Sequence, residues 1–156
     1  MQAETAMAIL LEGIEQTGLA DKGWSAGWDR ARLRFGACWP KRKQITLSRV
    51  LTELNDEAQV RDTVLHELAH ALAFERYGRV RSHGPEWKAI AQSLGASPRA
   101  CSSTGLLPKG RYALVHRTTG EVYRTYQRKP RRTNLQGRYI QGRKAETLNQ
   151  LQVIEL

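Results

Sequence analysis

The amino-acid sequence predicts an α+β fold followed by a small, basic region rich in strands. Three observations lead to this prediction. Two short segments within residues 32–47 alternate between apolar and polar side chains, as strands do. Two helical segments follow, and each carries an apolar stripe at helical spacing. The last third of the chain combines hairpin-like alternation with an excess of Lys and Arg.

The charge of the chain is unevenly distributed. Its 156 residues include 25 Lys and Arg against 15 Asp and Glu, which gives a formal net charge of +10. Residues 101–156 hold 11 of the basic and only 3 of the acidic residues. A region this basic predicts a polyanionic partner, most often nucleic acid. We therefore predict one domain over residues 1–100 and a basic subdomain over residues 101–156.

Cysteine usage indicates a reducing compartment, and hydropathy predicts no membrane span. Cys38 and Cys101 do not form a C-x-x-C pair, so neither a disulfide framework nor a thiolate zinc site is predicted. The N-terminal segment has no basic region typical of a signal peptide, and no segment reaches the roughly 18 apolar residues of a membrane span. We expect a cytoplasmic protein without a membrane partner, and its charge is compatible with association with the nucleoid.

The first fifty residues are predicted to form one helix and two strands. Residues 3–17 place apolar side chains at helical spacing, and Gly18 ends this helix. Strands are predicted over residues 32–39 and 44–47. Pro40 and the lysines after it supply the turn between them.

Two further helices are predicted next. The first is capped by Asn55 or Asp56, and Gly78 ends it. The second begins at Pro85, which suits a first helical turn, and stops before Gly95. The apolar stripe of the first helix consists of Val60, Val64, Leu68 and Leu72.

The basic subdomain is predicted to consist of β-hairpins. Residues 111–127 alternate around a turn at residues 118–120. The basic segment 128–134 then leads to a second, poorer hairpin over residues 137–154. A partly ordered basic tail is the alternative interpretation of the same residues.

The first of the two later helices carries the pattern His66-Glu67-x-x-His70. Residues four apart lie on one face of a helix, so the two imidazoles can bind one ion. Zinc held by three protein ligands keeps a position open for water and lowers the pKa of that water. Glu67 stands beside this position and can accept the proton, so the pattern predicts hydrolysis of amide bonds.

The third ligand is expected at the start of the next helix. His83 is favoured because its side chain can project back towards the preceding helix, and Gly84 allows close backbone approach beside it. Glu86 is the alternative, since a carboxylate completes the zinc site in some His-His-Glu enzymes.

The segments DRARLRFGACW, ITLSRVL, VRDTVLHELAHAL and HGPEWKAIAQSLG together resemble the SprT-like (Spartan-type) zinc metalloproteases, over about residues 28–101. The resemblance implies that His66, His70 and His83 bind one zinc ion and that Glu67 is the catalytic base. It also implies a minimal zincin fold, in which a small sheet packs on the metal-bearing helices. Better-known members cleave proteins bound or crosslinked to DNA, and DNA stimulates them. Protein substrates and DNA are therefore the expected partners.

The region that follows departs from the family pattern. Many members continue with a zinc ribbon built on two C-x-x-C pairs, and all four of these cysteines are missing here. His116 alone cannot hold a second ion. We therefore expect a ribbon-like subdomain that contains no metal.

Arginine and tyrosine are interleaved in this subdomain. Guanidinium groups fit phosphates, and tyrosine rings can stack on bases, although single tyrosines also serve hairpin packing. The sequence lacks the signatures of the common groove-reading motifs, so single-stranded or distorted DNA is the expected target. The residues expected to bind nucleic acid are Arg128, Lys129, Arg131, Arg132, Arg138, Arg143 and Lys144.

Taken together, the sequence predicts a zinc-dependent metalloendopeptidase that acts on DNA-bound or DNA-crosslinked proteins, with DNA as activator. One alternative is a nucleic-acid-binding regulatory protein with a structural zinc centre. Glu67 argues against it, because a closed structural site needs no base. The other alternative is a peptidase indifferent to DNA, and salt-sensitive DNA binding by residues 109–144 would argue against that.

Overall fold

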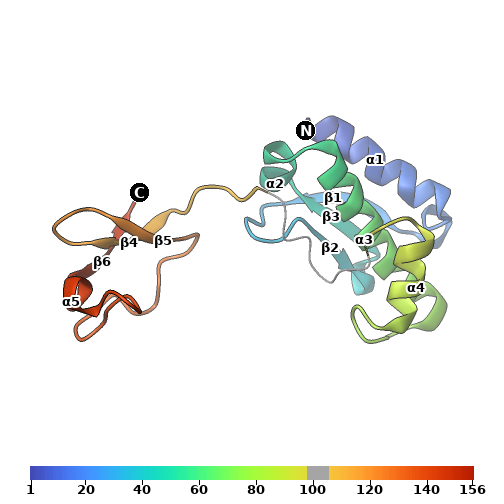
Figure 1. The fold of residues 1–156 in the computed structure, drawn as a ribbon. Coiled ribbons are helices and arrows are strands. Elements are labelled where there is room, and N and C mark those ends of the chain that lie inside the picture. The colour runs from blue at the N-terminus through green and yellow to red at the C-terminus, as the bar shows by residue number, and fades with distance from the viewer. Residues whose placement is uncertain (98–105) are drawn as a thin grey trace. The chain divides into compact units, whose positions relative to one another are not determined.

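The structure is a computed structural model that describes residues 1–97 and 106–156. Cys101 and the predicted domain boundary at residue 100 lie outside these residues. The chain divides into two compact units, unit 1 over Met1–Pro108 and unit 2 over Lys109–Leu156. Both units combine helix and sheet, which confirms the α+β prediction (Figure 1).

Unit 1 contains a three-stranded sheet in the order β1-β3-β2. The strands are β1 (Ser25–Asp29), β2 (Gly36–Trp39) and β3 (Gln44–Ser48). β1 runs parallel to β3, whereas β2 runs antiparallel to it. The structure confirms the strand predicted over residues 44–47. β1 was not predicted, because Gly23 and Gly27 give this segment the composition of a loop.

The prediction that β2 begins at residue 32 is wrong, since this strand starts at Gly36. The residues before it form a turn around Asp29 instead. The Ala31 N–H donates to Asp29 Oδ1 at 2.9 Å, and Arg34 Nη2 pairs with Asp29 Oδ2 at 2.9 Å. These local interactions offer the backbone an alternative to the sheet, and they keep the arginine-rich segment out of it.

Asp56 caps the longest helix of unit 1, because its Oδ1 accepts the N–H of Gln59 at 2.9 Å, and Gly78 ends the helix with a φ of 69°. A shorter helix, absent from the sequence prediction, begins where Ser48 Oγ accepts the N–H of Leu51. None of the helices in the described residues has both the length and the hydropathy needed to cross a bilayer. The helices described in unit 1 are α1 (Ala3–Gln16), η1 (Ala20–Lys22), η2 (Pro40–Arg42), α2 (Arg49–Leu54), α3 (Glu57–Tyr77) and α4 (Pro85–Ser93).

Helix α3 lies at the centre of unit 1, in contact with α1, α4 and β2 (Figure 1). Its predicted apolar stripe is buried, with exposed fractions of 1–2% at Val60, Val64 and Leu68. Ile45 and Leu47 of β3 are buried in the same core. Burying one such aliphatic side chain contributes about 1.5–3 kcal/mol to folding. Because the apolar stripe is held in the core, the other face of α3 is held against β2 and α4.

Unit 2 is built on a second sheet, in the order β5-β4-β6. β4 (Tyr112–His116) and β5 (Val122–Tyr126) pair antiparallel, as the alternation of the sequence predicted. The second hairpin predicted over residues 137–154 is wrong. Those residues form the helical turn α5 (Lys144–Thr147) and the strand β6 (Leu151–Glu155), which pairs with β4 instead of with a neighbour in sequence.

Candidate metal centre

Three histidines of unit 1 converge on one point. His66 and His70 lie one turn apart on α3, and His83 precedes α4. Their Nε2 atoms are separated by 3.2 Å (His66 to His70), 3.1 Å (His70 to His83) and 3.1 Å (His66 to His83). Of the described residues, only these three form a group of His, Cys, Asp or Glu able to hold a metal ion. Glu86, the alternative third ligand, is not a member of the group.

The three nitrogens fit zinc. Zinc binds imidazole nitrogen at about 2.0–2.1 Å and prefers tetrahedral geometry, so two bound nitrogens lie about 3.3 Å apart. The observed separations of 3.1–3.2 Å match this value. Three ring nitrogens cannot all hydrogen-bond one another at these distances, because a neutral imidazole carries a single N–H. The separations therefore suit three ligands of one metal ion better than a hydrogen-bonded network.

The backbone at His83 is unusual. Its φ is +56°, in the left-handed region that costs most non-glycine residues free energy and that histidine visits more often than most. This conformation turns the imidazole towards α3 just before Gly84 and Pro85 start helix α4. Strain of this kind persists where the surrounding structure holds it, often at functional sites.

Trp87 forms the floor beneath the three imidazoles. Its ring centroid lies 4.7 Å from that of His66, 5.2 Å from that of His70 and 4.6 Å from that of His83. The side chain is fully buried, and its Nε1 donates to the carbonyl oxygen of His66 at 3.4 Å. The sequence identified Trp87 only as part of an apolar helix face, since nothing in its spacing points to the metal group.

Burial keeps the histidines uncharged in the metal-free protein. It lowers the pKa of His66 to about 4, with a further contribution from the neighbouring His83. It lowers the pKa of His70 to about 3, where His66 and His83 also contribute. The pKa of His83 is lowered by burial as well. Neutral imidazoles at pH 7 present the lone pairs that a metal ion needs.

Glu67 lies on the same side of α3 and is 8% exposed. Burial raises the pKa of its carboxyl to about 7, while Arg34 and a hydrogen bond from the backbone N–H of Cys38 lower it. Gly36 of β2 lies directly against the Glu67 side chain. The carboxyl group is therefore enclosed between α3 and the edge strand of the sheet. Gly36 was not singled out by the sequence, although a glycine inside a strand is a known sign of close approach.

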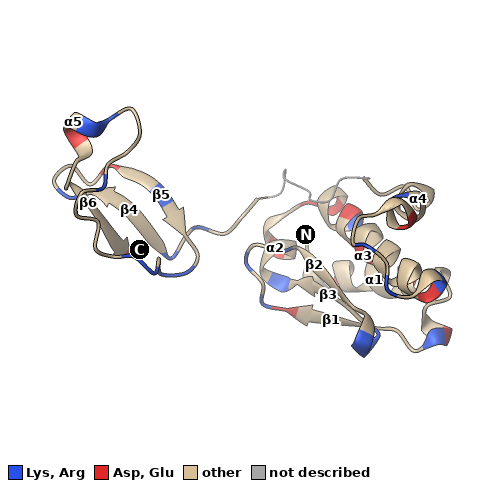
Figure 2. Ribbon diagram, turned by 90° about the horizontal axis from the view of Figure 1, so that it is seen from below, with Lys and Arg blue, Asp and Glu red and all other residues tan. Residues whose placement is uncertain are grey.

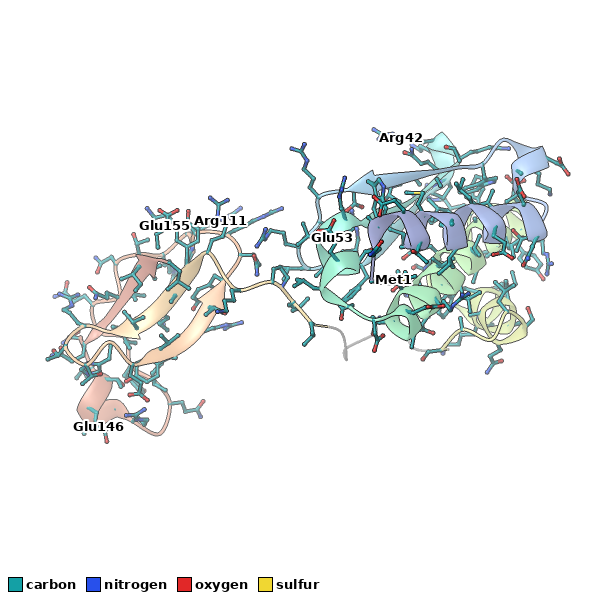
Figure 3. The ribbon with its side chains drawn as sticks, turned by 90° about the horizontal axis from the view of Figure 1, so that it is seen from above. Met1, Arg42, Glu53, Arg111, Glu146 and Glu155 are labelled. Carbon is teal, nitrogen blue, oxygen red and sulfur yellow. The ribbon has the colours of Figure 1, made fainter. Side chains whose placement is uncertain are left out.

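A cleft of about 1010 Å³ contains the histidines and Glu67. β2 lines one side and the segment between α3 and α4 lines the other. Arg42, the last residue of η2 after β2, has its side chain at the surface of unit 1 (Figure 3). Few of the described residues that line the cleft carry a carboxylate. The basic residues around it are Arg34, Lys41, Arg42, Arg79 and Arg81.

The residues predicted to bind nucleic acid all lie in unit 2, where Lys and Arg are spread over the loops (Figure 2). Arg143 differs from the others because it pairs with Glu121 and with Glu146, each at 2.7 Å. Lys144 Nζ lies 5.2 Å from the ring centroid of Tyr139. The exposed members of the set are Arg128, Lys129, Arg131, Arg132, Arg138 and Lys144.

Comparison with known proteins places this site in a family. A family model described as the SprT-like family matches residues 6–105, which is more than half of the chain. Protein SprT of Escherichia coli O1:K1 is 41% identical over 63 residues, covering 40% of this chain and 38% of the relative. Protein SprT of Pectobacterium carotovorum is 41% identical over 59 residues, covering 38% of this chain and 35% of the relative. The chain thus matches less than two fifths of these relatives' length. It belongs to the SprT-like family.

Proposed function

We propose that the protein is a zinc-dependent metalloendopeptidase, with His66, His70 and His83 as zinc ligands and Glu67 as catalytic base. The observation that carries this proposal is the convergence of three imidazole nitrogens beside a buried carboxyl group in an open cleft. A structural zinc site is closed by a fourth protein ligand, and the described residues offer none here.

Zinc bound by the three imidazoles would lower the pKa of a coordinated water and polarise a peptide carbonyl. Glu67 accepts a proton during attack on the peptide bond and returns it to the leaving amine. A buried carboxyl group beside the zinc ligands suits both steps, because burial favours its protonated form and so helps it to hold the proton between them. The fixed ring positions above Trp87 hold the ligands in one geometry.

The edge position of β2 supports a polypeptide substrate. β2 lies at the end of the sheet, so no described strand of unit 1 pairs with its outer side. Residues 35–39 also line the cleft. An extended peptide that added to this edge would receive backbone hydrogen bonds and would lie beside the histidines. Backbone recognition of this kind predicts low selectivity for side chains.

We also propose that unit 1 is a minimal zincin and that unit 2 is ribbon-like. Helix α3 packs on β2 with its two histidines and Glu67 facing the cleft, which is the arrangement expected of a minimal zincin. We assign unit 2 as a ribbon-like subdomain that works without metal. The proposal that it needs no metal rests on the sequence, in which the four cysteines of the two C-x-x-C pairs are missing and His116 stands alone.

Unit 2 would deliver the protease to DNA. It carries 11 of the 25 basic residues and 3 of the 15 acidic residues. Six of the seven residues predicted to bind nucleic acid are exposed, which suits contact with phosphates. The proposed substrates are therefore proteins bound or crosslinked to DNA, and the proposed DNA is single-stranded or distorted.

The test uses the zinc-loaded full chain and a single-strand DNA-binding protein held on an oligonucleotide. Gel analysis of cleavage, with and without the oligonucleotide, separates the possible functions. We expect zinc-dependent cleavage that the oligonucleotide accelerates. Equal cleavage without DNA would favour a DNA-independent peptidase. DNA binding without any cleavage would favour a regulatory protein with a structural zinc centre.

A further inference from the structure

Gly36 of β2 packs directly against the Glu67 side chain. A Cβ atom built on Gly36 would meet Glu67 Cγ at 2.9 Å, Thr63 Cγ2 at 3.0 Å and Glu67 Oε1 at 3.2 Å. Real Cβ atoms essentially never approach other heavy atoms below 3.0 Å. The two α3 residues are themselves held, because Glu67 is 8% exposed and Thr63 is 7% exposed.

The backbone of Gly36 does not require a glycine for conformational reasons. Its φ is not among the positive values found at other glycines of the described chain, and it pairs in register with Leu47 of β3. Glycine in a strand costs stability, because it loses more backbone entropy on folding than other residues do and packs no side chain, and this holds for Gly36, the first residue of β2. The reason for glycine at this position is therefore space for the neighbouring helix.

We propose that Gly36 is a positioning residue for the Glu67 carboxylate, and that its missing side chain sets the distance between β2 and α3 at the cleft. The inference rests on the proposed function of Glu67 as catalytic base. The Cys38 N–H, two residues along the same strand, donates to the same carboxylate. A side chain at residue 36 would push Glu67 aside and break this bond. A shift of about 1 Å in a catalytic group can cost about 100-fold in rate.

Gly27 provides a matched control within the same sheet. A Cβ at Gly27 of β1 would also meet a heavy atom at 2.9 Å, but that atom is Nε2 of Gln44, the far end of a flexible side chain. Gln44 is not among the residues that line the cleft. Gly27→Ala thus adds the same atom to the same sheet without contacting Glu67.

The first experiment compares Gly36→Ala and Gly27→Ala in the zinc-loaded full chain. Unfolded casein serves as substrate, and zinc affinity is measured by competition with a chromophoric chelator. For Gly36→Ala we expect kcat to fall at least tenfold, while KM and zinc affinity stay within about twofold of wild type. Gly27→Ala should keep the wild-type kcat. Wild-type kcat in folded, zinc-loaded Gly36→Ala would overturn the proposal, as would a parallel loss of zinc and activity.

A second variant covers the case in which Gly36→Ala does not fold. Thr63→Ser removes the Cγ2 atom that opposes the new Cβ but keeps the hydroxyl, which donates to the Gln59 carbonyl oxygen at 2.9 Å. Combined with Gly36→Ala, it leaves Glu67 as the main opposing group. We expect this double variant to fold and to remain slow. If it is folded, zinc-loaded and fully active, the proposal is wrong.

A double-mutant cycle on thermal stability separates this inference from the proposed function. Glu67→Ala removes both Glu67 atoms that a Cβ at residue 36 would meet. Gly36→Ala should therefore lower the Tm less in the Glu67→Ala background than in wild type. Coupling without any peptidase activity would refute the proposed function and leave the contact established. Activity in wild type together with strictly additive Tm changes would refute the role of Gly36.

Discussion

Unit 1 and unit 2 use their charged and polar residues in different ways. Unit 1 encloses Glu67 and three half-buried histidines at fixed separations, supported by a core that spans three helices and a sheet. In unit 2 the buried hydrophobic side chains of the described residues are Ala113, Val115 and Leu151, and most basic side chains are exposed. In the function proposed above, unit 1 depends on exact distances, whereas unit 2 depends on accumulated charge. Single substitutions should therefore act steeply in unit 1 and gradually in unit 2.

The distribution of charge sharpens this comparison. Residues 30–43 of unit 1 contain six basic and no acidic side chains, although residues 1–100 as a whole are nearly neutral. Arg34 and Arg42 lie 5.5 Å and 5.8 Å from the ring centroid of Trp39, which is 38% exposed. Five basic residues of unit 1 line the cleft, whereas those of unit 2 are spread over its loops.

The largest effect is expected for Glu67→Gln. Removal of a general base lowers rates by about 100-fold to 10,000-fold, and the amide keeps the size of the side chain. Zinc content should stay at wild-type level, which metal analysis of the purified protein checks. Glu86→Gln is the control, because Glu86 lies outside the group of metal-binding residues, and it should retain activity. Cleavage by Glu67→Gln at the wild-type rate would remove Glu67 from the mechanism.

His83→Ala should abolish tight zinc binding. Substituting a residue that only hydrogen-bonds to a zinc ligand already costs about 10-fold to 100-fold in zinc affinity. The loss of a ligand itself should exceed that range. Chelator competition measures the affinity directly. His116→Ala removes the one histidine of unit 2 and should leave zinc affinity unchanged. Equal affinities of wild type and His83→Ala would show that another group completes the site.

Unit 2 should respond in smaller steps. Arg131→Gln and Arg132→Gln each remove one exposed cation. For single-stranded DNA, each lost phosphate contact reduces the slope of log affinity against log salt by about 0.7. Fluorescence anisotropy of a labelled oligonucleotide at several salt concentrations gives this slope. Arg61→Gln, which makes the same charge change at an arginine paired with Glu57, is the control and should leave the slope unchanged. A slope that stays at the wild-type value in both unit 2 variants would exclude them from the interface.

The smallest effect concerns the stability of the metal-free protein between pH 7 and 5. The pKa values of His66 and His70 are lowered to about 4 and about 3, below the value of about 6.5 for the unfolded chain. Because the pKa of His83 is lowered as well, the unfolded chain takes up at least two more protons there, and stability falls as the pH falls. Glu67 has the opposite effect on stability. Its pKa is raised to about 7 in the folded chain, so over this pH range the folded chain binds one proton that the unfolded chain does not. The Tm should drop modestly in wild type and more steeply in Glu67→Gln; equal slopes would contradict this assignment.

The sequence predicted those parts of unit 1 that depend on local patterns. The caps of α3 at Asp56 and Gly78, its apolar stripe, and the pairing of His66 with His70 follow from spacing along one helix. The structure places His83, and not Glu86, in one group with His66 and His70, and His83 has a φ of +56° just before α4. Local signals of this kind survive folding because tertiary packing reinforces them.

Features that depend on contacts between distant residues were not predicted. The close approach of Gly36 to Glu67 joins residues that are far apart in sequence, and a glycine in a strand gives only a weak signal for it. β6 pairs with β4 across most of unit 2, whereas alternation alone suggested a local hairpin. Arg143 was predicted to bind nucleic acid. In the structure it pairs with Glu121, 22 residues away in sequence, and with Glu146, three residues further along the chain.

We propose that His66, His70 and His83 hold a zinc ion for hydrolysis assisted by Glu67. The rate of casein cleavage tests this, measured on the purified full chain after a chelator has stripped it of metal and during titration with zinc. We expect no cleavage by the stripped protein and recovery of activity that saturates at one zinc per chain. A folded protein that binds one zinc and cleaves nothing, or one that cleaves equally well without metal, would contradict it.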